Sequence, residues 1–332
     1  MKKIVLAVGS ALVLFSCAVQ NPQKVYESSL KSISTENLKR DLYIIASDEM
    51  QGRDTGSPGQ KKAGEYMINQ YKKNGIGHPP SMSSYYQKVP SEYMSKRKKI
   101  NDSENILAYI EGSEKPNEII VVSAHYDHVG MNNGQIYNGA DDDGSGTVGV
   151  MAIAEAFHKA KKAGHGPKRS ILFLHVTGEE KGLFGSSYYS DNPIFPLANT
   201  VADLNIDMIG RVDPLHKDNP NFVYVVGSEM LSSQLKEAVE KANKATHNLY
   251  LDYKYDDPKD PDRIYYRSDH YNFAKHNIPI AFFFDGIHED YHKPTDTPDK
   301  IDYPLLMKRT QLVFTIAWDL ANRPDRIVVD KK

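Results

Sequence analysis

Short, mostly apolar segments alternate with amphipathic segments along most of this 332-residue sequence. The apolar segments predict strands at 105–110, 119–124, 171–176, 201–206, 222–226 and 278–284. Other segments predict helices at 57–75, 145–163, 231–245 and 303–321. Strands that are apolar on both faces are typical of a parallel sheet that helices cover on both sides. The sequence therefore predicts an α/β fold with a mostly parallel, mixed central sheet.

The first 17 residues have the order of parts found in an export signal. Lys2 and Lys3 make the start positive, an apolar run follows, and the run ends at Cys17. Residues 14–17 resemble a bacterial lipoprotein processing box, in which cleavage precedes the cysteine and lipid is attached to its sulfur. A plain signal peptide with an incidental cysteine is the alternative.

These features divide the chain into three parts. We expect a lipoprotein signal at 1–17, a polar tether or N-terminal arm at 18–34, and a single large domain at 35–325. The protein is then exported and held at a membrane through Cys17, facing the periplasm or the cell exterior. Its oligomeric state stays open.

Charge and cysteine content exclude several classes of function. The formal net charge is −2, so no excess of basic residues is present to neutralise nucleic-acid phosphates or anionic lipids. Cys17 is the only cysteine, which excludes disulfides and cysteine-based zinc sites. We expect no nucleic-acid partner, and contact with a membrane only through a lipid on Cys17.

Polar clusters lie at or just beyond the ends of the apolar segments. They occupy 123–127, 138–144, 177–180, 205–207 and 290–292. In an open α/β sheet, ligands bind at the carboxyl ends of the strands. The clusters offer imidazole and carboxylate groups without thiolate, which is the ligand set of catalytic zinc and related divalent ions. Together they predict a metal site at this edge of the sheet.

Single clusters are ambiguous when each is taken alone. His125 and Asp127 are two residues apart at a strand end, so the carboxylate can accept the second N–H of an imidazole that binds metal. A structural histidine with a hydrogen bond is the alternative. The three carboxylates at 141–143 repel one another unless a cation, hydrogen bonds or a helix N-terminus compensates.

The later clusters have alternatives as well. Glu179 and Glu180 point differently, so one can bind metal while the other acts as a general base, although surface Glu-Glu pairs are common. Asp207 ends an apolar strand, where it is either a ligand or a helix cap. His292 competes with His288, and their spacing does not decide between them.

Two further segments have uncertain roles. Residues 251–263 contain five aspartates and two prolines, which predicts a loop that is either a calcium site, a wall recognising a positive amine, or simply solvated. Aromatic and apolar residues near the last clusters are candidates for a side-chain pocket or for the core. They are Tyr265, Tyr266, Phe283, Phe284 and Ile287.

The clusters in their order resemble the dinuclear zinc exopeptidases typified by bacterial leucine-type aminopeptidases. The resemblance rests on 125–127, 139–146, 179–180, Asp207 and 291–292, and it spans roughly 40–322. It implies a zinc exopeptidase (phosphorylase/hydrolase-like) architecture, with 35–325 as the catalytic domain. It also implies two Zn²⁺ ions per chain and peptide substrates with a free N-terminus.

The same resemblance implies roles for the metal-binding residues. His125 and Asp207 bind one zinc, Glu180 and His292 bind the other, and Asp142 bridges both. His292 is preferred to His288 because a Thr/Asp-rich turn follows it, as in the family.

The remaining implied roles concern catalysis. Glu179 is the general base, Asp127 orients the first histidine, and Tyr291 hydrogen-bonds the oxyanion. A cis peptide bond is implied between Asp142 and Asp143. The implied reaction is the removal of N-terminal residues by water that bridges the metals, is deprotonated by Glu179 and attacks the peptide carbonyl.

Two other functions within the resemblance remain open. A glutaminyl cyclase uses a similar scaffold with one zinc, but those enzymes tend to carry tryptophan before the final histidine, where this chain has Tyr291. Some relatives keep the fold as a non-enzymatic binding ectodomain after losing ligands, whereas all five ligand positions and the base are present here.

Overall fold

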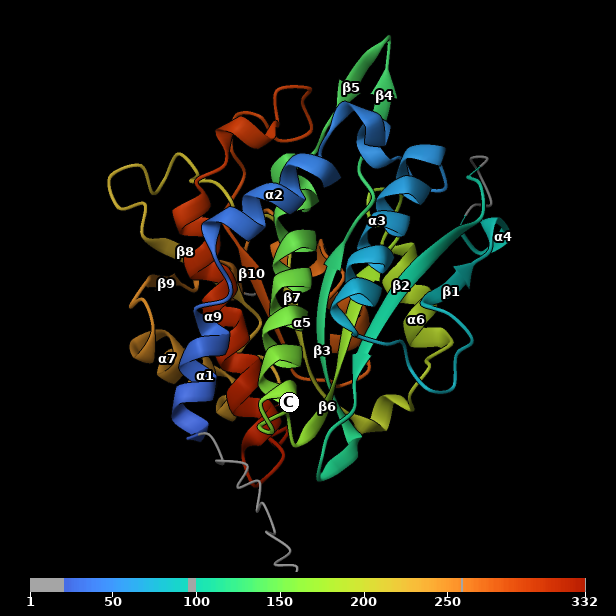
Figure 1. The fold of residues 1–332 in the computed structure, drawn as a ribbon. Coiled ribbons are helices and arrows are strands. Elements are labelled where there is room, and N and C mark those ends of the chain that lie inside the picture. Colours follow the sequence, from blue (N-terminus) through green and yellow to red (C-terminus); the bar gives the residue numbers. More distant parts are fainter. Residues whose placement is uncertain (1–20, 95–99, 258, 332) are drawn as a thin grey trace, which may run out of the picture.

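The computed structural model describes residues 21–94, 100–257 and 259–331 (Figure 1). The predicted export signal and Cys17 lie outside these residues. The described chain is built on an eight-stranded mixed sheet with the order β1-β2-β6-β3-β7-β10-β8-β9. Its strands are β1 Tyr86–Val89, β2 Ser103–Ile110, β3 Lys115–His125, β6 Arg169–Val176, β7 Thr200–Ile206, β8 Phe222–Val226, β9 Tyr250–Asp252 and β10 Ile280–Phe284.

The centre of the sheet is parallel and its margins are mixed. Strands β6, β3, β7 and β10 pair in parallel, whereas β2 and β8 pair with them antiparallel. Every residue of β6 and β7 is buried, as expected for strands covered on both faces. The prediction of a mostly parallel, mixed sheet is confirmed.

Helices cover both faces of this sheet (Figure 1). One face packs against the helices α2 Thr35–Ile45, α3 Pro58–Asn74, α5 Gly146–Lys162, α7 Ser233–Ala245 and α9 Tyr303–Asn322. The other face packs against α6 Phe184–Asp191 and α8 Tyr271–Ala274. Short elements α4 Ser91–Met94 and the hairpin β4 Gly130–Asn132 with β5 Gln135–Tyr137 lie outside the sheet.

Helix α3 begins and ends where its sequence predicts. The Ser57 side chain accepts from the N–H of Gln60, Pro58 is the first helical residue, and Gly75 ends the helix in the left-handed region with φ 76°. Gln60 does not complete a capping box, because its Oε1 accepts from the N–H of Gly56 at 2.6 Å.

The segment expected to be a tether or arm contains a helix in its described part. Helix α1, Pro22–Leu30, packs against α5 and α9, and the Tyr26 hydroxyl lies 2.9 Å from Thr315 Oγ1. Among the described residues, none of the helices combines the length and the apolar character needed to span a bilayer.

The acidic segment 251–263 is not all loop. Leu251 and Asp252 belong to β9, which pairs in parallel with β8. The prediction missed this strand because the aspartates and prolines that follow dominate the composition of the segment.

Candidate metal centre

Sheet register brings His125 and Asp207 together. Ser123 on β3 pairs with Asn205 on β7, so His125, the last residue of β3, lies beside Asp207, which directly follows β7. His125 Nε2 lies 3.6 Å from Asp207 Oδ1. The other carboxylate oxygen of Asp207 accepts a hydrogen bond from Ser268 Oγ at 2.7 Å, which fixes its orientation.

The three adjacent aspartates take three different directions. Asp141 accepts from Gly210 N at 2.7 Å and faces His288, whereas Asp143 accepts from the N–H groups of His125, Gly146 and Met208. Of these three aspartates, only Asp142 lies between His125 and His292. Its Oδ1 is 3.2 Å from His125 Nε2, and its Oδ2 is 2.9 Å from His292 Nε2. The peptide bond between Asp142 and Asp143 is cis.

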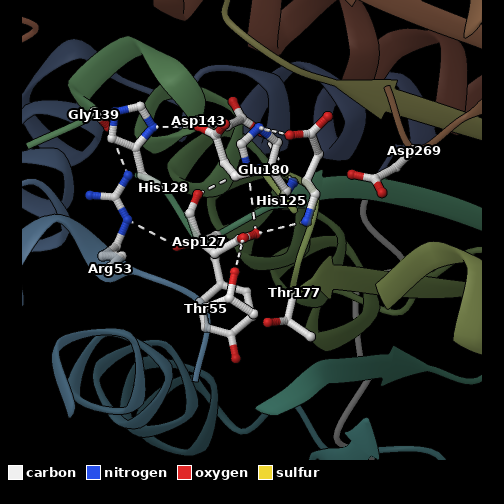
Figure 2. A network of polar contacts seen from close by, with 12 residues as sticks. Arg53, Thr55, His125, Asp127, His128, Gly139, Asp143, Thr177, Glu180 and Asp269 are labelled. Atoms are coloured by element: carbon white, nitrogen blue, oxygen red, sulfur yellow. Dashed lines mark hydrogen bonds and ion pairs between the residues drawn. The ribbon is translucent and has the colours of Figure 1, made fainter. Parts of the chain in front are cut away.

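Arg53 fixes the loop that carries these aspartates. Its fully buried guanidinium donates to the carbonyl oxygens of Tyr126, Asn138 and Gly139, besides that of Ile45 (Figure 2). The chain after β3 and the loop before α5 are thus held by one side chain. This contact joins segments more than 70 positions apart in sequence from Arg53.

Glu179 and Glu180 follow β6 and occupy different positions. Glu180 Oε2 lies 3.1 Å from His292 Nε2, whereas Glu179 Oε2 lies 4.0 Å from His125 Nε2 and lines a cleft. The N–H of Glu179 donates to Asp127 Oδ1 at 3.2 Å. One carboxylate thus faces the histidines, and its neighbour faces the space open to a substrate.

The geometry separates the two candidate histidines of the last cluster. His292 contacts both Asp142 and Glu180, while His288 Nε2 lies 3.2 Å from Asp141 Oδ2, away from the cleft. His292 has φ 54°, a left-handed conformation that is uncommon for residues other than glycine and is often found at functional sites.

Two groups of potential ligand atoms result. His125, Asp142 and Asp207 form one group, and His128, Asp142 and Glu180 form the other. Asp142 is shared between them. The donors are imidazole and carboxylate groups, and several of their atoms are buried without a hydrogen-bond partner, so the residues fit a pair of divalent ions.

Crowded buried acids dominate the electrostatics of the centre. Burial raises the pKa of Glu179 well above its usual value, against the effect of His125. Burial tends to lower the pKa of His292, but the carboxylates of Asp142 and Glu180 outweigh it and raise that pKa to about 10. A divalent cation would relieve the repulsion among these acids.

One expected contact is different in the structure. The closest acceptor to His125 Nδ1 is the backbone carbonyl oxygen of Asp127, at 3.0 Å, and the carboxylate oxygen Oδ1 is 3.7 Å away. The carboxylate instead accepts from Thr55 Oγ1 at 2.6 Å and from Glu179 N. The chain turns after β3 ends at His125, so the alternation assumed for a continuing strand does not hold.

A small cleft opens onto the centre. Its polar lining residues are His125, Asp142, Glu179, Asp207, Arg267 and Ser268, with Tyr291 beside them. Its apolar lining residues are Met208, Ile264, Phe282, Phe284 and Ile287. An apolar wall thus faces the acidic centre.

The structure separates the residues for which the sequence left a side-chain pocket and the core as alternatives. Phe284 and Ile287 line the cleft, but Phe283 points into the core on the other face of β10, and Tyr265 and Tyr266 do not line the cleft. Successive residues of a strand face opposite sides, so Phe282 and Phe284 share the cleft side.

Sequence reasoning also missed residues that shape the centre. His128, Arg53, Thr55 and Ser268 all contact predicted site residues or their backbone. Only His128 had a visible signal, since it directly follows the 125–127 cluster. The other three come from segments that carry no metal-ligand pattern.

The sequence pattern of peptidase family M28 matches residues 105–317, which include every predicted site residue. The chain belongs to this family. The predicted resemblance to zinc exopeptidases is thereby confirmed at the family level.

This M28 chain has relatives among proteins of known sequence. It is 30% identical over 223 residues to a probable leucine aminopeptidase from Arthroderma otae, a match that covers 65% of this chain and 57% of the relative. The chain therefore spans little more than half the length of that relative.

Solved structures share the fold of this M28 chain. The Legionella pneumophila LapA aminopeptidase superposes with a TM-score of 0.70 at 19% identity, covering 98% of this chain and 81% of that chain. A glutaminyl cyclase from Porphyromonas gingivalis superposes with a TM-score of 0.66 at 18% identity, covering 86% and 97%. Because an aminopeptidase and a cyclase both match, the fold alone does not choose between the two reactions.

Proposed function

We propose that this protein is a metallo-aminopeptidase that uses two zinc ions to remove N-terminal residues from peptides. The observation that carries the proposal is the convergence of His125, Asp142, Glu180, Asp207 and His292, with Asp142 between the other four. Bound zinc would polarise a peptide carbonyl and lower the pKa of a water molecule.

The chain supplies the proton transfers. Glu179 lines the cleft beside the centre, and it is its backbone N–H that donates to the Asp127 carboxylate, so the Glu179 carboxylate can take a proton from water. It then returns that proton to the leaving amine. Tyr291, half-buried on the same cleft and with its ring stacked on His292 at 3.9 Å, is placed to donate to the oxyanion.

The apolar wall of the cleft supports a preference for substrates with an apolar first side chain. Phe282, Phe284, Met208, Ile264 and Ile287 would bury such a side chain. The small size of the cleft favours removal of single residues over cleavage within a long chain.

A paired substrate panel tests the reaction. The protein should hydrolyse leucine amide, which has a free amine, and should not hydrolyse N-acetyl-leucine amide. Metal analysis of the same sample should give two zinc ions per chain. A peptide beginning with glutamine tests the cyclase alternative. Rejection of every free-amine substrate, or cyclisation of that peptide by protein with one zinc ion, would overturn the proposal.

We also propose that the protein is exported and lipidated at Cys17. The positive start, the apolar run and the residues around Cys17 support this. In cells fed labelled fatty acid, the wild-type protein should take up label and fractionate with membranes, whereas Cys17→Ser should do neither.

A further inference from the structure

His128 occupies a position that the fold has shaped for it. Its backbone N–H donates to the carbonyl oxygen of Arg53 at 3.1 Å, and its side chain is fully buried. The ring packs directly on Gly139, where an added Cβ would come within 2.5 Å of its Cδ2. Figure 2 shows the ring of His128 beside Gly139 and above the Arg53 side chain.

Two imidazoles flank the same two carboxylates. His292 Nε2 lies 2.9 Å from Asp142 Oδ2 and 3.1 Å from Glu180 Oε2. His128 Nδ1 lies 3.7 Å from the same oxygen of Asp142 and 2.8 Å from the other oxygen of Glu180, Oε1. The two rings meet edge to face with centroids 5.6 Å apart.

Protein atoms do not satisfy the ring of His128. Nδ1 is close to Glu180 Oε1, yet the two are not aligned as a hydrogen bond, and both are buried without a hydrogen-bond partner among the described residues. Nε2 is buried without such a partner as well. Buried polar atoms without partners are rare, and an ion between converging donors is one way to satisfy them.

We propose that His128 is a third imidazole of the metal centre and binds, through Nδ1, the ion held by Asp142 and Glu180. The proposal rests on the two-metal function proposed above. His292 has a side chain that is 38% exposed, whereas His128 is fully enclosed. A second, buried imidazole makes retention of this ion less dependent on the exposed histidine.

Metal-binding titrations on paired variants test this role. Wild-type protein should bind two Zn²⁺ ions in competition with a chromophoric chelator. In His128→Ala and in His128→Gln, the affinity for the ion held by Asp142 and Glu180 should fall on the order of a hundredfold. A fall of less than about tenfold would not fit the loss of a ligand. His276→Ala removes an exposed imidazole and should bind both ions like the wild type.

The glutamine variant separates a ligand from a hydrogen-bonding partner. Its amide can still donate to Glu180 but offers no imidazole nitrogen. Wild-type affinity in His128→Gln would overturn the proposal in favour of a positioning role, and wild-type affinity in both variants would overturn it outright.

A measurement on unmodified protein avoids any folding defect of the variants. In protein loaded with ¹¹³Cd²⁺ and labelled with ¹⁵N-histidine, the metal should couple to three rings, and the ring of His128 should couple through Nδ1. Coupling to His125 and His292 alone would overturn the proposal. Failure of the wild type to bind two ions would instead refute the two-metal function itself.

Discussion

Glu179 and Glu180 are neighbours in sequence but differ in their surroundings. For Glu180, burial and the charge of Asp142 act to raise the pKa, but the imidazoles of His128 and His292 outweigh them and lower it. For Glu179, burial dominates and the pKa is raised well above the usual value. A metal-facing carboxylate beside a more basic one is the arrangement expected for a ligand and a general base.

The division of roles predicts opposite results for two substitutions. Glu179→Gln should keep both metal ions and lose on the order of a hundredfold or more in kcat, because only the proton acceptor is removed. Asp142→Ala should lower the metal content, since the shared ligand is lost. Metal analysis and steady-state kinetics on both proteins check this, and near-normal kcat in Glu179→Gln would refute its role as base.

Asp203 is a buried acid away from the cleft, and it makes stability depend on pH. Burial raises its pKa to about 8, while the hydrogen bond from Ser123 Oγ opposes the rise. In the unfolded chain the pKa is about 3.9. Between these values the folded protein holds a proton that the unfolded chain lacks, so this residue makes stability fall as pH rises from about 4 to 8.

Asp203→Asn should remove that dependence. The free energy of unfolding of the variant, minus that of wild type, should increase from pH 5 to pH 8 by at most about 1.4 kcal/mol per pH unit. Urea unfolding of the metal-free proteins at several pH values measures the difference. Asp218→Asn, at an exposed acid, is the control and should show a constant difference. If the difference in the free energy of unfolding between Asp203→Asn and wild type did not change with pH, Asp203 would not be the source of the pH dependence.

At the scale of elements, the segment from Gly139 to Ser145 connects the sheet to α5 and carries Asp142, the proposed shared ligand. It is held by Arg53 from one side, and Asp296 accepts the N–H groups of Asp141 and Asp142 from the other. Gly139 has φ 56°, and a Cβ there would lie 2.3 Å from the carbonyl oxygen of Asp142. The segment therefore has no space to shift.

Gly139→Ala should consequently damage the centre. Gly134, at the tip of the β4–β5 hairpin, also has positive φ, 78°, but open space around it. In both variants, alanine in a left-handed backbone conformation should lower the free energy of unfolding by about 1 kcal/mol. Only Gly139→Ala should add the clash, losing more than about 2 kcal/mol in the free energy of unfolding.

Zinc titration and denaturant unfolding compare the two variants. Gly139→Ala should bind zinc more weakly than wild type, and Gly134→Ala should bind it equally well. Equal zinc affinity in both would show that the segment tolerates displacement.

At the scale of the whole molecule, the core does not depend on the metal centre. The buried faces of β3, β6, β7 and β10 pack against helices on both sides (Figure 1). The site residues lie at the last residue of β3 or in segments that follow strands. Packing of these apolar faces supplies the main driving force for folding. Repulsion among the crowded carboxylates of the centre opposes folding until a cation binds.

Removal of metal should therefore abolish activity without unfolding the protein. After chelation, far-UV circular dichroism should be retained and Tm should fall. Zinc at a hundredfold excess over Kd should restore about 2.7 kcal/mol per ion, because it binds only the folded protein. A Tm that does not respond to zinc would contradict a metal centre at this place.

Sequence alone determined the central strands, the covering helices α3, α5, α7 and α9, and the order of the polar clusters, whereas α2, α6 and α8 were not predicted. A short apolar run such as 171–176, in a chain where such runs alternate with helical segments, favours a strand buried in a sheet. The structure brings Asp142, Glu180 and His292 of the motif together, and their role as metal ligands stays a prediction. β9 was missed, because a short marginal strand depends on its neighbour rather than on its own composition.

Only the tertiary structure decided which side chains meet around the centre. The register of β3 against β7 sets His125 beside Asp207, and the turn after β3 carries His128 inward while directing the Asp127 carboxylate to Thr55. Arg53 and Ser268 reach the centre from segments without any ligand pattern. Such contacts depend on distances between segments far apart in the chain, which local sequence preference does not encode.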